Sequence, residues 1–181
     1  KGATREGNNI SPEMQWSGAP DTTKSFALIV VDKDVPASFE KANQKDKVIA
    51  ESEPRQNFYH WVLTDIPVNM YGFSEGQASK GALPGGKFLG RTEYGVNGQN
   101  DYAKVFGGYG ESGWGGYDGP CPPWNDEIRH RYVFTVFALD VERLPLDGKF
   151  GGQQVRDAMT GHILGQAAIT GVYTLNPDVK L

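Results

Sequence analysis

The sequence predicts a mostly β protein, an antiparallel β-sandwich with a short helical region near the C-terminus. Apolar segments of strand length recur along the chain, and long irregular segments rich in glycine separate them. Apolar residues repeat with a helical period in only one place, in the C-terminal quarter. Because strands and helices do not alternate, the pattern argues against a parallel sheet built from β-α-β units.

Four segments are predicted to be strands. Residues 25–31 are apolar on both alternating faces, which is typical of a strand in the middle of a sandwich. Residues 59–66 form a second candidate that stops before a proline. Residues 131–139, rich in β-branched and aromatic residues, are the strongest candidate, and residues 168–175 are the fourth.

One helix and two long loops complete the predicted architecture. The apolar face of the helix consists of Val155, Ala158, Met159, His162 and Ile163. Gly161 is expected to weaken or end this helix. Residues 37–57 are polar and charged and indicate a surface excursion, whereas residues 84–128 are rich in Gly, Tyr and Trp. Loops of this length in a compact domain are usually functional.

The composition indicates one domain that spans residues 1–181. A chain of 181 residues has the size of a single domain, and 38% hydrophobic residues, with 12% aromatic residues, are enough for a packed core. The net charge is −4 and the basic residues are scattered, which argues against nucleic acid as a partner.

Cysteine usage and the apolar runs bear on the cellular compartment. The single cysteine, Cys121, cannot close an intrachain disulfide, which fits a reducing compartment. The longest apolar run, residues 26–31, is too short to span a bilayer, and no signal peptide is visible. We therefore expect a cytoplasmic protein without a membrane span, or a periplasmic one if a leader was removed before Lys1.

Two glycine-containing segments imitate known motifs without completing them. Residues 81–87 have the spacing of a phosphate-binding P-loop, but Phe88 stands where a hydroxyl must bind magnesium. Residues 110–114 lack the last glycine of the nucleophile elbow of serine hydrolases. We therefore expect neither a nucleotide cofactor nor a serine nucleophile, and we predict no cofactor at all.

A series of short segments stands in a characteristic order along nearly the whole chain. They are Asn9-Ile10-Ser11-Pro12, Gln15-Trp16, residues 23–28, Asp32-Lys33-Asp34-Val35-Pro36, His60-Trp61-Val62, Gly119-Pro120-Cys121-Pro122-Pro123, residues 130–134, Gly161-His162-Ile163-Leu164 and Gly171-Val172-Tyr173. In this order the chain resembles the phosphatidylethanolamine-binding protein family, which includes the mammalian Raf kinase inhibitor protein and plant flowering-time regulators. The Gly-Pro-Cys-Pro-Pro loop is usual in the bacterial, Raf kinase inhibitor-like branch, and the resemblance implies a β-sandwich of this family's type.

The resemblance also implies a ligand-binding site at one end of the sandwich. Its expected residues are Asp32, Asp34, His60, Gly119, Pro120, Cys121, Pro122, His130 and Tyr132. From spacing alone, Asp32 and Asp34 share one side of an extended strand, and His130 and Tyr132 share a face. A carboxylate helps a nearby imidazole to keep its proton. We therefore expect both histidines, the loop N–H groups and the Tyr132 hydroxyl to donate hydrogen bonds to a phosphate-like anion.

Each of these residues also has a purely structural interpretation. Either histidine could be a satisfied core residue, the aspartates could cap a turn, and Tyr132 could belong to the core. His162 is expected in the core or at a helix cap. Two Asp and two His would suffice for zinc by number, but their spacing matches no metal motif, so we predict no metal. No neighbouring motif activates Cys121, which argues against a catalytic thiol.

Two departures from the family pattern affect the site. Residues 37–57 form a longer excursion than in the compact members, beside the expected pocket mouth. Lys33 stands where many members have proline, which leaves the turn between the two aspartates less stiff.

The expected function is non-catalytic binding of a phosphate-bearing or other anionic head group of the phospholipid type. Two other classes stay open. Relatives in the family inhibit kinases or serine proteases, so the chain could regulate another protein through residues 37–57. A phosphoester hydrolase could use His60 and His130 as acid and base, although nothing identifies its substrate. By resemblance to bacterial relatives we also expect a homodimer.

Overall fold

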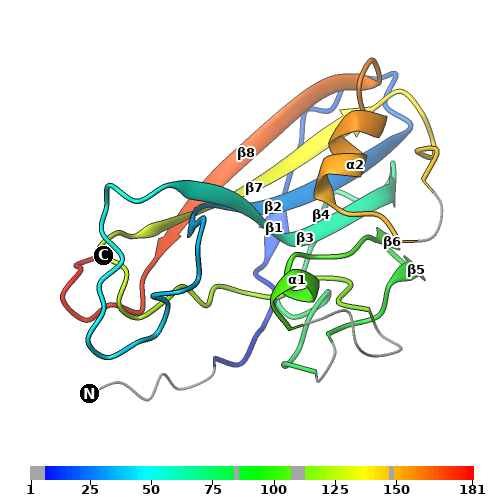
Figure 1. Cartoon of the computed structure of the whole chain (residues 1–181). Coiled ribbons are helices and arrows are strands. Elements are labelled where there is room, and N and C mark those ends of the chain that lie inside the picture. Colours follow the sequence, from blue (N-terminus) through cyan, green and yellow to red (C-terminus); the bar gives the residue numbers. More distant parts are fainter. Residues whose placement is uncertain (1–6, 84–85, 107–112, 147–148) are drawn as a thin grey trace.

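The computed structural model describes residues 7–83, 86–106, 113–146 and 149–181 and shows a mostly β, antiparallel fold, which confirms the predicted class (Figure 1). The main sheet has six strands, in the order β5 (Gly90–Thr92), β6 (Gly95–Asn97), β3 (Arg55–Pro67), β2 (Ser25–Pro36), β7 (His130–Leu139) and β8 (Ile163–Tyr173). A second, two-stranded sheet pairs β1 (Met14–Gln15) with β4 (Gly72–Phe73). The helices are α1 (Tyr102–Phe106) and α2 (Gly152–Ala158).

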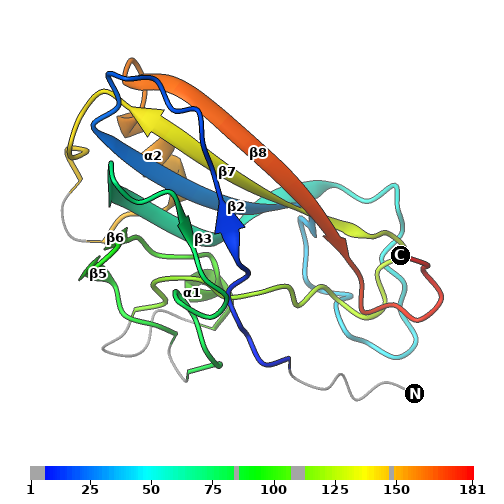
Figure 2. The same cartoon turned by 180° about the vertical axis from the view of Figure 1, so that it is seen from behind.

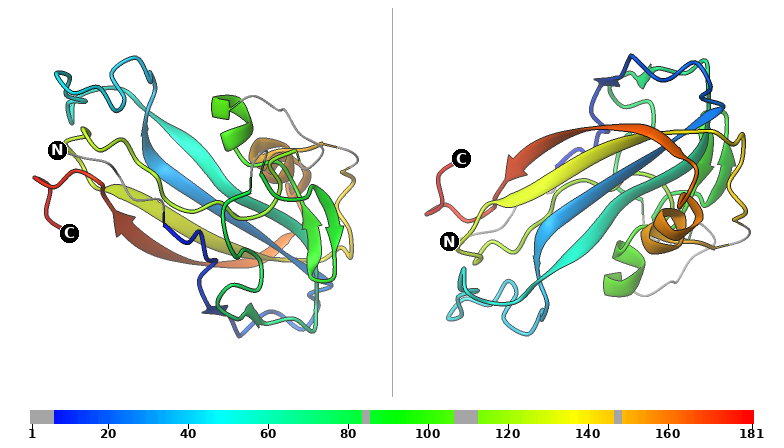
Figure 3. Two further views of the ribbon diagram at one scale, coloured as in Figure 1. Left: turned by 90° about the horizontal axis from the view of Figure 1, so that it is seen from below. Right: turned by 90° about the horizontal axis from the view of Figure 1, so that it is seen from above.

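Both faces of the central strand β2 are buried, as the apolar pattern of residues 25–31 predicts. Along β2, Phe26, Leu28 and Val30 pack into one core, and the alternate residues pack into the other. The short strands β1 and β4 cover the first core, and Figure 2 shows β1 crossing the sheet on the side away from α2. The second core receives Val155 and Met159 from the α2 region, which lies close to β3 (Figure 3).

The C-terminal region differs from the sequence prediction at two boundaries. The helix α2 ends at Ala158, so the apolar period from Val155 to Ile163 does not describe one helix. The chain then turns through Gly161, which has a φ of +84°, and β8 begins at Ile163 rather than at residue 168. His162 is neither in the core nor at a helix cap: it lies in this turn, half-exposed, and its Nδ1 is 2.8 Å from Oδ1 of Asp140.

The topology brings the expected site residues to one end of the sheet. Asp32 lies near the end of β2 and is opposite both Phe58 on β3 and Tyr132 on β7. The loop of residues 37–54 and the chain around residues 120–129 gather at the same end, whereas β2 starts and β3 and β7 finish at the other (Figure 1). Within the described residues, no helix is long and apolar enough to cross a membrane.

Candidate functional site

His130 is held between two carboxylates at the start of β7. The side chain is fully buried, and its Nδ1 is 2.8 Å from Oδ2 of Asp32 while its Nε2 is 3.2 Å from Oδ2 of Asp126. Burial disfavours the protonated ring, but the hydrogen bonds to Asp126 and Asp32 outweigh this and raise the pKa of His130 to about 9. His130 is therefore a cation near neutral pH, and both of its N–H groups are already used.

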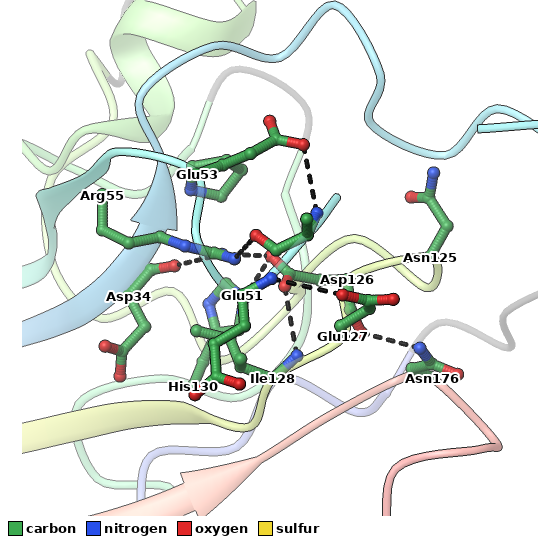
Figure 4. Close-up of polar contacts among 12 residues, drawn as sticks. Asp34, Glu51, Glu53, Arg55, Asn125, Asp126, Glu127, Ile128, His130 and Asn176 are labelled. Atoms are coloured by element: carbon green, nitrogen blue, oxygen red, sulfur yellow. Dashed lines mark hydrogen bonds and ion pairs between the residues drawn. The ribbon is translucent and has the colours of Figure 1, made fainter. Parts of the chain in front are cut away.

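Asp126 connects this histidine to the 37–54 loop (Figure 4). Nη1 of Arg55 is 2.5 Å from Oδ2 of Asp126 and donates a second hydrogen bond to the Asp34 carbonyl, while Nη2 donates to the Ala50 carbonyl. Neither Arg55 nor Asp126 is anticipated by the sequence reasoning. The only signal is that Arg55 and Asp126 lie near the C-terminal ends of the two predicted long loops, and polar residues at such positions are too common to single out.

The two aspartates of the Asp-Lys-Asp segment have different partners. Asp32 faces His130 and also accepts the backbone N–H of Asp34 at 2.8 Å. The Asp34 carboxylate accepts two hydrogen bonds from the Arg131 side chain, at 2.6 and 2.8 Å, and a third from the Arg131 backbone N–H at 2.8 Å. Burial alone would raise the pKa of Asp34, but the Arg131 contacts outweigh burial and lower it. The register of β2 shifts between Asp32 and Val35, which lets the two carboxylates separate.

His60 is neutral and buried on the other side of Asp32. Its Nδ1 is 2.7 Å from the Asp118 carbonyl oxygen, which only accepts, so Nδ1 carries the proton. Burial lowers the pKa of His60, although the Asp118 carbonyl and nearby carboxylates oppose this effect. In the neutral ring Nε2 of His60 can only accept, so the donor role expected for this imidazole requires a second ring proton.

Aromatic rings surround His60. Phe58, Tyr102 and Tyr132 have ring centroids 5.1, 5.5 and 5.2 Å from the imidazole. The Tyr132 hydroxyl is buried beside Asp32 and forms no hydrogen bond of regular geometry with any described residue. Burial raises the pKa of Tyr132, and the charge of Asp32 and a weak contact of the hydroxyl with its carboxylate add to this effect, so the hydroxyl keeps its proton. A buried donor without a regular hydrogen bond is rare and requires an explanation.

The 119–122 loop is fixed by the residues that precede it. Asp118 accepts hydrogen bonds from Nζ of Lys87 at 2.5 Å and from the side chains of Asn9 and Asn100, at 2.7 and 2.9 Å. The Gly119 N–H donates to Oδ1 of Asn9 at 2.8 Å, so it is occupied rather than offered to an anion as expected. The Tyr102 hydroxyl donates to the Gly119 carbonyl at 2.9 Å.

All nine predicted site residues therefore lie at one end of the sheet, in two halves. The charged half contains Asp32, Asp34 and His130; together with Asp126 and the two arginines described above, its three carboxylates and three cations balance one another. The aromatic half contains His60 and Tyr132, with Gly119, Pro120, Cys121 and Pro122 following Asp118 at its edge. Pro120 and Cys121 are exposed, whereas Pro122 is buried. Within the described ranges, no group of three or more His, Cys, Asp or Glu side chains is arranged to hold a metal ion.

Comparison with known proteins agrees with this fold. The family model described as phosphatidylethanolamine-binding protein matches residues 2–174. A UPF0098 protein of Methanothermobacter thermautotrophicus is 34% identical over 94% of this chain and 86% of its own length. The UPF0098 protein YbcL of Escherichia coli is 31% identical over 94% of this chain and 74% of its own length.

Solved structures give the same result. The crystal structure of Escherichia coli YbcL superposes with a TM-score of 0.67 at 29% identity and covers 96% of this chain and 85% of YbcL. A phosphatidylethanolamine-binding protein homologue, CT736, from Chlamydia trachomatis superposes with a TM-score of 0.62 at 29% identity and covers 91% and 80% of the two chains. The chain belongs to the phosphatidylethanolamine-binding protein family. Its relatives lie in the bacterial and archaeal branch, so the resemblance stated from the sequence is confirmed.

Proposed function

We propose that the protein binds a phosphate-bearing anionic group in the aromatic half of the site, without turning it over. The observation that carries this proposal is the buried Tyr132 hydroxyl, which forms no regular hydrogen bond with a described residue and lies beside the neutral imidazole of His60. A ligand that accepts from Tyr132 and donates to Nε2 of His60 would satisfy both groups. The charged half supports the site by position and contributes no spare donor from His130, because both ring nitrogens face carboxylates.

This arrangement favours a phosphate group that keeps one proton. A phosphomonoester has a second pKa of about 6, so at neutral pH a minor fraction keeps one proton, and the site would select this form, which offers a P–OH to His60 and a bare oxygen to Tyr132. A phosphodiester, as in an intact phospholipid, has no P–OH and must therefore bind to protonated His60. Since burial lowers the pKa of His60, we expect diester binding to strengthen as the pH falls.

An NMR titration of the histidine ring signals tests the proposal. At neutral pH, inorganic phosphate and phosphoethanolamine should shift the His60 signals saturably, and glycerophosphoethanolamine should do so only at lower pH. Tyr132→Phe should weaken phosphate binding about tenfold, because the variant loses one hydrogen bond to a charged group, worth about 1.5 kcal/mol. Tyr71→Phe, at a tyrosine that is 52% exposed and lies outside the site, is the matched control. Equal affinity in the two variants, or His60 signals that ignore every ligand, would contradict the proposal.

Catalysis is not part of the proposed function. His130 cannot exchange a proton with a substrate while both ring nitrogens are bound to Asp32 and Asp126. Hydrolysis of a phosphoester panel by the wild type, abolished in His60→Ala, would instead establish the phosphoester hydrolase considered from the sequence.

A protein-binding role, like that of a kinase or protease inhibitor, is the second candidate. The 37–54 loop presents two large apolar side chains to solvent, Phe39 at 45% and Val48 at 54% exposure. The loop is held in place by the Asn125 side chain, which donates to the carbonyls of Lys41 and Lys47 at 2.9 and 3.0 Å. Phe39→Ser with Val48→Ser should abolish binding of a protein partner and leave phosphate binding intact; loss of both would argue against this role.

We also propose the homodimer that the resemblance implies, with β8 as its interface. This strand lies at the edge of the main sheet, is exposed along nearly its whole length and carries no charged residue. A second copy could pair with it antiparallel without bringing like charges together. Light scattering should show a dimer that Ile169→Lys converts to a monomer, whereas Leu181→Lys, at a similarly exposed position, leaves it intact.

A further inference from the structure

A second cleft lies at the end of the sheet opposite the candidate site. It has a volume of about 510 Å³ and is lined by polar and charged side chains that include Lys24, Asp65, Asn69, Arg91, Glu142 and Arg143. These residues come from the start of β2, the end of β3, β5 and the segment after β7. The volume falls within the range of roughly 300–1,000 Å³ that is usual for small-molecule sites.

The cleft has more cationic than anionic groups, and its cations are poorly paired. Lys24 and Arg143 form no ion pair with any residue that the structure describes, and Arg91 reaches Oδ2 of Asp65 only at 3.8 Å. Elsewhere, Arg55 and Arg131 lie within 2.6 Å of a carboxylate oxygen. In a chain with a net charge of −4, a concave surface whose three cations outnumber its two carboxylates, Asp65 and Glu142, favours anions locally.

Asp65 forms part of the lining and is held in an unusual conformation. Its φ is +53°, a region that non-glycine residues seldom adopt and that is often found at functional sites. The side chain is only 11% exposed, and its Oδ1 accepts the Leu144 N–H at 3.0 Å, which joins the end of β3 to the segment after β7. Burial raises the pKa of Asp65, although Arg91 and Arg143 oppose this effect. The remaining carboxyl oxygen faces Arg91 loosely and can accept from a ligand.

We propose that this cleft is a second ligand site, for a small organic phosphate that also carries a hydroxyl or ammonium group. Lys24, Arg91 and Arg143 would bind the phosphate oxygens, since guanidinium and ammonium groups are the usual phosphate partners in proteins. Asp65 and Glu142 would accept from the hydroxyl or ammonium group of the same molecule. Along β2, Ser25 at this cleft and Asp32 at the first site are separated by seven residues, roughly 23 Å. The two sites are therefore distinct.

The test is an amide NMR titration of the full chain with pyrophosphate and with glycerol 3-phosphate. We expect saturable shifts of residues 24–25, 65–69 and 142–143 for both probes. Lys24→Gln with Arg143→Gln should weaken binding of each probe at this cleft at least tenfold. The matched control is Lys45→Gln with Lys47→Gln, which also removes two positive charges, but from the 37–54 loop. An equal loss in the control, or no saturable shift at these residues, overturns the proposal.

Two further variants sharpen the test. Asp65→Asn keeps an acceptor for the Leu144 N–H and removes an opposing charge, so it should tighten pyrophosphate binding at the cleft. Weaker pyrophosphate binding in this variant would overturn the assigned role of Asp65. Tyr132→Phe should leave the cleft titration unchanged, because Tyr132 lies at the first site. The experiment thus distinguishes an absence of phosphate binding at Tyr132 from an absence of binding at the cleft. Loss of cleft binding in Tyr132→Phe would overturn the claim of two independent sites.

Discussion

The two ends of the main sheet use similar charged residues in opposite ways. At the Asp32 end, Arg55, Arg131 and His130 each lie within 2.8 Å of a carboxylate oxygen. At the other end, Lys24 and Arg143 have no ion-pair partner among the described residues. Burial of the acidic partners explains the difference: the buried carboxylates Asp32, Asp34 and Asp126 must be paired, whereas exposed cations such as Lys24 and Arg143 need no partner. The comparison teaches that a cluster of charges indicates a ligand only when the protein has not already neutralised it.

The largest expected effect is at the paired end. His130→Gln removes the cation between Asp32 and Asp126 and leaves buried carboxylate charge without its partner. We expect the free energy of unfolding to fall by about 3–5 kcal/mol, measured by urea denaturation near neutral pH. A loss below about 1 kcal/mol would show that the cluster is not held together by this ion pair.

A pH dependence of stability follows from the same cluster. The pKa of His130 is raised from 6.5 to about 9 in the folded state, so the folded protein binds the proton more tightly. The resulting stabilisation, at most about 3 kcal/mol, is fully present below pH 6.5 and is lost as the pH rises through 9. Burial lowers the pKa of His60, so the contribution of this histidine has the opposite sign. It destabilises the folded protein as the pH falls below 6.5, outside this window. Unfolding free energies at pH 6.5 and 9.5 should show the loss, and the ring signals of His130 should titrate near pH 9.

Tyr132→Phe separates binding from stability in the aromatic half. The hydroxyl forms no regular hydrogen bond with a described residue, only a weak contact with Asp32, so its removal should change the free energy of unfolding by less than about 1 kcal/mol. Thermal or urea denaturation measures this change beside the loss of phosphate binding given above. A large destabilisation would mean that the hydroxyl serves the core rather than a ligand.

The smallest effect on stability is expected at the unpaired end. Lys24→Gln with Arg143→Gln removes two exposed cations and should change the free energy of unfolding by no more than about 0.5 kcal/mol. The same denaturation experiment measures it. A marked destabilisation would indicate that these cations have protein partners after all, and that the cleft is structural.

The strands could be predicted where the pattern was local. Residues 25–31 are apolar at alternating positions on both faces, and the structure buries them in two cores. The apolar period from Val155 to Ile163 was misleading, because a positive φ at Gly161 separates the helix from β8. The start of β8 was missed because residues 163–167 pair with β7 without an apolar alternation of their own. Their strand state depends on a partner that is distant in the sequence.

The sequence by itself, through the order of its short segments, determined the family and which residues belong to the predicted site. The protonation of the two histidines was decided only by the tertiary structure. Asp126 occupies Nε2 of His130, and the Asp118 carbonyl occupies Nδ1 of His60, so one ring becomes a cation and the other stays neutral. The second cleft likewise could not be predicted from the sequence, since Lys24, Asp65 and Arg143 come together only when the sheet forms. The physical reason is the same in each case: residue type and spacing fix which groups a chain carries, whereas burial and long-range neighbours fix their charge and the partners that remain available.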